Sequence, residues 1–119
     1  MKVAAVQLTS TGNITENQEL ALAKIREAAG NGARLIVLPE ATAQNFRSGR
    51  LDEQAQTLEG PFATAIQALA EELEVTVVAG MFCPADTVER EGKTINRVTN
   101  TALIAGPGVL GGYDKIHTY

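Results

Sequence analysis

The sequence lacks the residues that several classes of function require. Its 119 residues include one cysteine, one histidine and no tryptophan. A lone cysteine cannot form an intramolecular disulfide, and with a single histidine it cannot make the clusters that usually bind zinc. We therefore expect no disulfide framework and no metal site.

The charge balance and the apolar runs exclude two further classes of partner. The chain carries 10 basic and 14 acidic residues, a net charge of −4, and its basic residues are scattered. This pattern argues against a nucleic-acid-binding surface. No apolar stretch reaches the roughly 18 residues that span a membrane, and the N-terminus lacks a signal-peptide pattern. A soluble, cytoplasmic protein without nucleic-acid or membrane partners is expected.

The overall composition is that of a globular protein. Hydrophobic residues make up 45% and charged residues 20% of the sequence, which is too apolar for a disordered chain. The length allows one domain at most, so residues 1–119 are interpreted as a single domain. Because only 4% of the residues are aromatic, aliphatic side chains must supply most of the core.

The first two thirds of the sequence alternate between strand and helix patterns. Apolar runs predict strands at residues 3–8, 35–38 and 75–82. Helical spacing of apolar residues predicts helices over residues 13–29 and 60–73. Asn13 followed by Glu16 resembles a capping box at the start of the first helix, and Pro61 occupies a favoured position at the start of the second.

The remaining segments predict irregular structure and a hairpin. One turn of helix is predicted near residues 51–55, and residues 84–92 are predicted to form a charged loop. Strands are predicted at residues 94–105 and 109–115, joined by a tight turn at residues 106–108. The order β-α-β-α-β followed by a hairpin indicates an α/β fold with a partly parallel sheet.

Two charged residues are candidates for chemistry. Glu40 directly follows the second strand, where open α/β sheets place their ligand crevices, and Pro39 restricts the backbone before it. Lys115 lies near the end of the last strand and could project to the same rim. Taken singly, Glu40 could be a solvated loop residue, and Lys115 could be an edge-strand charge that blocks aggregation.

Three other features favour structural explanations. Cys83 follows a buried-looking strand and precedes Pro84, which favours an inert thiol over a nucleophile. His117 has no G-x-S-x-G partner motif, so we interpret it as a structural or supporting hydrogen-bonding residue. Residues 106–111 match G-x-G-x-x-G, but a strand-like segment follows where a dinucleotide site requires a helix, so the match indicates a hairpin turn.

Four segments together resemble the nitrilase, or carbon–nitrogen hydrolase, superfamily. Residues 2–7 resemble its first strand, which ends in glutamine, and residues 35–40 resemble the segment that delivers a catalytic glutamate. Residues 100–102 resemble the strand before its hairpin, and residues 113–117 resemble the Tyr-x-Lys-x-His stretch that delivers a catalytic lysine. Their order and rough spacing agree across all 119 residues.

The resemblance implies an active site that this chain holds only in part. Glu40 would be the general base and Lys115 the cation that stabilises the tetrahedral intermediate. The nucleophilic cysteine of the family lies downstream of the lysine, in a motif that these residues do not reach, so Cys83 does not take that role. The implied reaction needs no metal or organic cofactor: a small amide is hydrolysed to an acid and ammonia. Nitrile and carbamoyl substrates remain open.

The resemblance also implies an α-β-β-α sandwich, of which these residues would form one sheet with its two helices. Half a sandwich leaves one apolar sheet face uncovered. The chain is therefore interpreted as the N-terminal part of a longer hydrolase that assembles into a homo-oligomer, and as inactive by itself. The alternative is a non-catalytic α/β binding or assembly module, which would fold alone as a soluble monomer.

Overall fold

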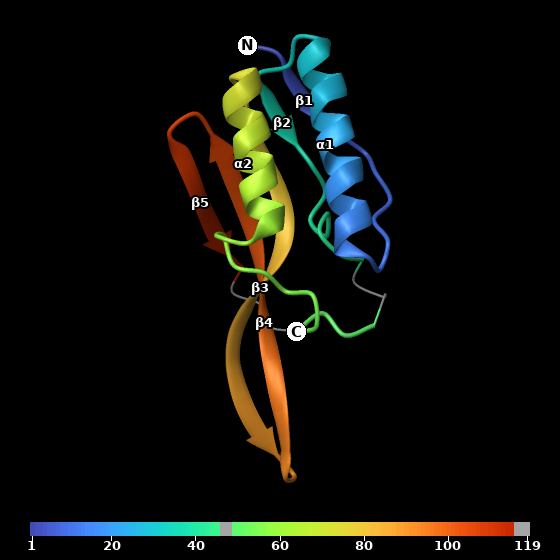
Figure 1. Ribbon diagram of the computed structural model, residues 1–119, viewed down its shortest axis with the longest axis vertical. Helices are drawn as coiled ribbons and strands as arrows, with labels where there is room; N and C mark the ends of the chain where they lie inside the picture. The colour runs from blue at the N-terminus through green and yellow to red at the C-terminus, as the bar shows by residue number, and fades with distance from the viewer. Residues whose placement is uncertain (46–48, 116–119) are drawn as a thin grey trace.

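The computed structural model describes residues 1–45 and 49–115, which form one mixed sheet with two helices against it (Figure 1). The strands follow one another across the sheet in chain order. Neighbours pair in parallel from β1 to β3 and antiparallel from β3 to β5. The strands are β1 (Val3–Ala5), β2 (Leu35–Val37), β3 (Thr76–Arg90), β4 (Lys93–Gly106) and β5 (Val109–Asp114).

Both helices cover the same face of the sheet. α1 (Ile14–Gly30) connects β1 to β2, and α2 (Pro61–Leu73) lies between β2 and β3. Parallel strands are joined by right-handed crossovers, so two crossovers that move in the same direction across the sheet place their helices on one side. α1 begins as expected: the side chain of Asn13 accepts a hydrogen bond of 3.0 Å from the backbone N–H of Glu16. The α/β fold with a C-terminal hairpin is confirmed.

The hydrophobic core fills the space between the helices and the sheet. Its aliphatic character agrees with the composition, and Phe62 is its one large aromatic member among the described residues. Burial of such a side chain contributes about 1.5–3 kcal/mol. The largest of its fully buried residues are Ile25 from α1, Phe62 and Ile66 from α2, and Ile36, Met81 and Leu103 from the sheet.

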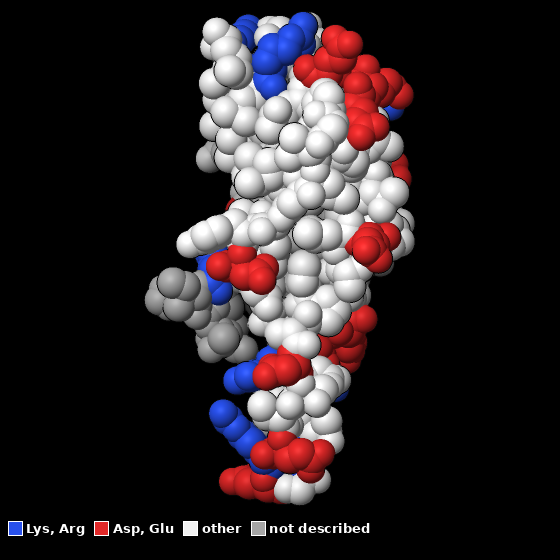
Figure 2. Space-filling model, turned by 90° about the vertical axis from the view of Figure 1, so that its left-hand side faces the viewer, with Lys and Arg blue, Asp and Glu red and all other residues white. Residues whose placement is uncertain are grey.

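The opposite sheet face carries apolar side chains that nothing in the described structure covers. Val37, Val78 and Ile104 lie side by side on β2, β3 and β4, and Val37 and Ile104 are each 37% exposed. Val3, Val109 and Tyr113 continue this face, which we call the open face, toward both edges of the sheet. Figure 2, viewed from the β5 side, shows a largely uncharged stretch in the upper half of the molecule, with charged side chains at the top and from mid-height downward. The apolar face expected of half a sandwich is therefore present.

One sequence interpretation was wrong: residues 84–92 do not form a loop. β3 continues to Arg90 and pairs with β4, with a register shift between Pro84 and Thr87, so that the two strands project as a long arm (Figure 1). The arm turns at Glu91 and Gly92, which both have positive φ, 52° and 77°. Two left-handed residues match the twist of a two-residue hairpin. The turn was missed because its sequence is Glu-Gly, whereas the usual signal for such a hairpin is Asn-Gly.

Two smaller differences concern element bounds. Residues 51–54 form a series of bends without a helical turn, so the short helix predicted near residues 51–55 is absent. β1 ends at Ala5 and does not reach residue 8, although the N–H of Val6 still donates to the carbonyl of Val37 at 2.9 Å. In the described part of the chain, no helix has the length and hydropathy to cross a membrane.

Candidate active site

Glu40 and Lys115, which the sequence places far apart, form an ion pair at the carboxyl end of β2. Lys115 Nζ lies 3.0 Å from Glu40 Oε2, and the two side chains are 37% and 43% exposed. Lys115 directly follows β5, and its backbone N–H donates to the carbonyl of Asn100 at 2.9 Å, which extends the pairing with β4. The fold thus brings the two candidate residues together.

Asn100 is a third member of this cluster and was missed as a site residue by sequence reasoning. Its Nδ2 donates to Glu40 Oε1 at 2.6 Å, so each carboxylate oxygen has its own donor. Asn100 lies within β4 and is 1% exposed. Its Oδ1 is buried without a hydrogen-bond partner among the described residues. The signal available in the sequence was an asparagine, a residue depleted from strands, inside a predicted strand.

The backbone of Glu40 reaches this position because Gly80 has no side chain. A β-carbon built at Gly80 would lie 1.3 Å from the Glu40 carbonyl oxygen. The Gly80 N–H donates to the Pro39 carbonyl at 3.1 Å, and the Ala43 N–H donates to the Gly80 carbonyl at 3.1 Å. After β2 the chain therefore crosses directly over β3, on the open face, and presents the Glu40 side chain there.

Asn17 ties down the segment that follows Glu40. This α1 residue is 1% exposed, and its Nδ2 donates at 2.9 Å to the carbonyls of Thr11 and Ala43. Its Oδ1 accepts from the Thr11 N–H at 2.7 Å. A further hydrogen bond, in which Thr42 Oγ1 donates to the Pro39 carbonyl, closes the turn around Glu40. A buried amide with all these bonds fixes the loop against α1.

The cluster keeps Glu40 ionised. The pKa of Glu40 lies below its ordinary value because the hydrogen bond from Lys115, then that from Asn100, stabilises the carboxylate, while partial burial acts in the opposite direction. A carboxylate held by an ammonium and an amide is stabilised in its charged form. The lysine, in turn, has a fixed anionic partner and presents a positive charge at the open face.

A small cavity lies directly beside the three residues. It has a volume of about 130 Å³ and is lined by Glu40, Asn100 and Lys115 together with the small residues Gly80 and Ala102, which pair across β3 and β4. Ala102 leaves room where a larger side chain would fill the space, whereas the Glu40 backbone occupies the position of a side chain at Gly80. The arrangement can hold a small polar group between an anion and a cation.

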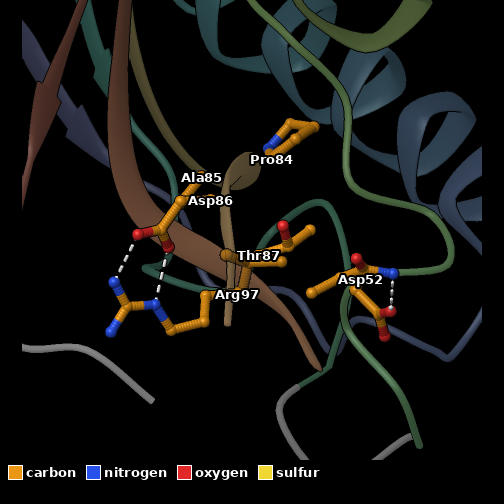
Figure 3. Close-up of a pocket in the computed structure, with 8 residues that line it drawn as sticks. Asp52, Pro84, Ala85, Asp86, Thr87 and Arg97 are labelled. Carbon is orange, nitrogen blue, oxygen red and sulfur yellow. Dashed lines mark hydrogen bonds and ion pairs between the residues drawn. The ribbon is translucent and has the colours of Figure 1, made fainter. Parts of the chain in front are cut away.

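A larger cavity lies at the base of the arm, and its charges are already paired. It has a volume of about 610 Å³ and lies between the β3–β4 arm and Asp52. Figure 3 shows Arg97 facing Asp86, to which it donates two hydrogen bonds. Asp52 pairs with Arg50 and accepts from Asn96. Because these groups satisfy one another, size alone does not make this cavity the functional site.

The other sequence candidates lie apart from the cluster. Cys83 is half-buried, and it faces the helix side of the sheet with Met81, away from Glu40. Burial raises the pKa of its thiol, and a hydrogen bond with Thr101 opposes that rise, which agrees with an inert cysteine. The glycine-rich segment forms the β4–β5 turn, as interpreted. His117 lies outside the described residues.

The described residues offer no evident metal site. Across residues 1–45 and 49–115, no group of three or more His, Cys, Asp or Glu side chains lies close enough to hold an ion.

The chain belongs to the carbon–nitrogen hydrolase family, whose model matches residues 2–119. Its relatives include a hydrolase of Mycobacterium tuberculosis, 38% identical over 124 residues, and a deaminated glutathione amidase of Synechocystis, 36% identical over 117 residues. The alignments cover 100% and 98% of this chain but 41% and 42% of those proteins. The chain thus spans about two fifths of the length of the curated relatives it matches.

Solved structures show the same fold. A carbon–nitrogen hydrolase superfamily protein of Xanthomonas campestris superposes with a TM-score of 0.71 at 26% identity, covering 97% of this chain and 40% of that one. An amidase of Nesterenkonia superposes with a TM-score of 0.73 at 20% identity, covering 100% and 44%. The sheet with its two helices is therefore the nitrilase-type arrangement that the sequence motifs implied.

Proposed function

We propose that the full-length protein containing this chain is an amidase that hydrolyses a small amide to an acid and ammonia. The observation that carries this proposal is the Glu40–Lys115 ion pair, with a distance of 3.0 Å, beside a cavity on the open face. The family membership of the chain and its similarity to a deaminated glutathione amidase and to an omega-amidase of Pongo abelii support amide chemistry.

In the proposed mechanism, Glu40 is the general base and a cysteine outside this chain is the nucleophile. Glu40 takes the thiol proton while the sulfur attacks the amide carbonyl carbon. The carbonyl oxygen becomes an oxyanion, which the ammonium of Lys115 stabilises. The carbon–nitrogen bond then breaks, and Glu40 returns its proton to the departing ammonia. A thioester remains on the enzyme.

The second half of the reaction uses the same two side chains. Glu40 takes a proton from a water molecule, whose oxygen attacks the thioester carbon, and Lys115 again faces the oxyanion. The carbon–sulfur bond breaks, the acid leaves, and the thiolate regains the proton from Glu40. Each proton removed is returned, so no external acid or cofactor is required.

The chain alone is proposed to be inactive for a second reason besides the absent nucleophile. A general base works best when its pKa is near the working pH, whereas Lys115 and Asn100 hold the pKa of Glu40 low and its side chain is 43% exposed. A second layer packed on the open face would remove water from Glu40 and raise its pKa. The remainder of the protein would thus bring the pKa of Glu40 closer to the working pH and would also supply the thiol.

The proposal is tested with the full-length protein and a panel of short primary amides, including ω-amides of dicarboxylic acids. Ammonia release, together with an increase in protein mass equal to the acyl group, is the expected result. Release from nitriles or carbamoyl compounds alone would move the protein to another branch of the family. If no ammonia appears and the 119-residue chain runs as a stable monomer on a sizing column, the alternative of a binding module is favoured instead.

A further inference from the structure

We propose that Asn100 is a positioning residue for Glu40: its amide ties Oε1 to β4 and so holds the carboxylate in place for proton transfer. The hydrogen bonds that carry this proposal are independent of the reaction. Its meaning for proton transfer rests on the proposed amidase function.

Asn100 is linked to both charged residues of the site. Its side chain donates to Glu40 Oε1 at 2.6 Å, and its backbone carbonyl accepts from the N–H of Lys115 at 2.9 Å. The residue is 1% exposed and lies opposite the buried Phe82 in the β3–β4 register. A buried side chain in a paired strand has few accessible rotamers. Asn100 is therefore a fixed point from which the more exposed Glu40 side chain is held.

The orientation of the Asn100 amide matches an ionised Glu40. If the amide were reversed, Oδ1 would take the place of Nδ2 and two acceptor oxygens would face each other at the 2.6 Å separation. Among the described residues, no donor holds Oδ1 from the other side. The carboxylate is thus the group that sets the amide orientation, and the amide in turn occupies one lone pair of Oε1.

The unpartnered Oδ1 separates this role from a purely structural one. A buried acceptor without a donor lowers the stability of the folded state, and an apolar residue of similar size would avoid that loss. An asparagine selected for packing alone would have both ends of its amide satisfied. Among the described residues, only the end of the Asn100 amide that points to Glu40 is satisfied, so its polar interaction serves the carboxylate.

The experiment replaces Asn100 in the full-length protein and compares catalysis with stability. Asn100→Leu is expected to lower kcat by on the order of 10²-fold through misplacement of Glu40, with a smaller change in KM. The acidic limb of the pH–rate profile should move to higher pH, because the carboxylate loses a donor. The melting temperature should change little, because the lost hydrogen bond to Glu40 and the removal of the unpartnered Oδ1 act in opposite directions. Asn96→Leu is the matched control: this β4 amide also donates to a carboxylate, Asp52 Oδ2 at 3.3 Å, and its loss should leave the acidic limb in place.

A direct titration of Glu40 by carboxyl ¹³C NMR tests the proposal even if no amide is hydrolysed. The pKa of Glu40 should rise in Asn100→Leu and in Asn100→Asp, where a second carboxylate replaces the donor. Asn100→Asp keeps the size of the side chain and decides the matter if the leucine variant does not fold. An unmoved Glu40 titration in a folded variant, or full kcat with an unmoved acidic limb, overturns the proposal. Absence of ammonia release by the wild type, with the titration shifted as expected, overturns the amidase function alone.

Discussion

The carbonyl oxygen of Glu40 occupies the space that a side chain at Gly80 would need. The separation from a β-carbon built there is 1.3 Å, which two atoms that are not bonded to each other cannot adopt. The position of Glu40 on the open face therefore depends on a glycine in the neighbouring strand, and this dependence can be tested by substitution.

Gly80→Ala should move Glu40 away from Lys115 and Asn100. We expect a loss of activity of about 10²-fold and a loss of stability of about 1–3 kcal/mol from the added methyl group, measured as kcat/KM and by thermal unfolding. Gly30→Ala is the control, because a β-carbon there meets no atom within 4 Å and the residue is exposed at the end of α1, on the helix side of the sheet. Normal activity of Gly80→Ala would show that Glu40 does not need its observed backbone position.

Asn17→Ala should release the loop that follows Glu40. The substitution leaves the Ala43 carbonyl and the Thr11 backbone without their buried partner, and each unsatisfied group costs about 1–3 kcal/mol. Asn13→Ala removes the cap of the same helix at a cost of about 1 kcal/mol. Both variants should melt earlier, but only Asn17→Ala should also lower kcat/KM at a temperature where both proteins are folded. Equal activity of the two variants would contradict the role of Asn17 in holding the loop that follows Glu40.

Glu40 should make stability depend on pH in the acid range. Its folded-state pKa is lowered by Lys115 and Asn100, so its contribution is fully present above the unfolded pKa, near pH 4, and is lost as pH falls through the lower folded pKa. In the 119-residue chain, Glu40→Gln should be less stable than the wild type at neutral pH, and the difference should vanish in strong acid. Melting temperatures measured from pH 7 to pH 2 check this, and a difference that grows toward low pH would contradict the ion pair.

The open face should respond to a charge differently in the chain and in the full-length protein. Ile104→Asp should be tolerated by the 119-residue chain, because Ile104 is 37% exposed there, and should reduce binding of a dye that reports apolar surface. In the full-length protein, the same charge would be buried between two layers and should prevent folding or strongly destabilise it. Ala23→Asp, at an exposed position of α1, should have little effect in either. Tolerance of Ile104→Asp in both would argue against a covering layer.

The sequence was sufficient for the order of the elements but not for their extent or contacts. Apolar runs and helical spacing located the sheet and both helices, because burial imposes those periods directly. The β3–β4 arm was missed because its charged residues contact solvent on a two-stranded ribbon and leave no apolar period. The roles of Gly80 and Asn100 in the geometry depend on which residues of other strands lie opposite them. Such long-range register cannot be predicted from local pattern.

The pairing of Glu40 with Lys115 depends even more strongly on contacts between distant parts of the chain. Glu40 and Lys115 are ordinary charged residues when taken singly, and the 3.0 Å contact between them appears only after the sheet is assembled. The motifs placed both residues at strand ends, while Asn100 stood inside a motif without a role. In the fold its amide donates to the Glu40 carboxylate, and this contact is the basis of the positioning role proposed for it.

The most direct measurement is ammonia release from a small amide by the full-length protein and its Glu40→Gln variant. If Glu40 is the general base, the variant should lose about 10²–10⁴-fold in kcat/KM. Glu72→Gln, which removes a carboxylate from the exposed ion pair with Arg26, should retain wild-type activity. Near-normal turnover by Glu40→Gln would contradict the assignment of Glu40 as the base.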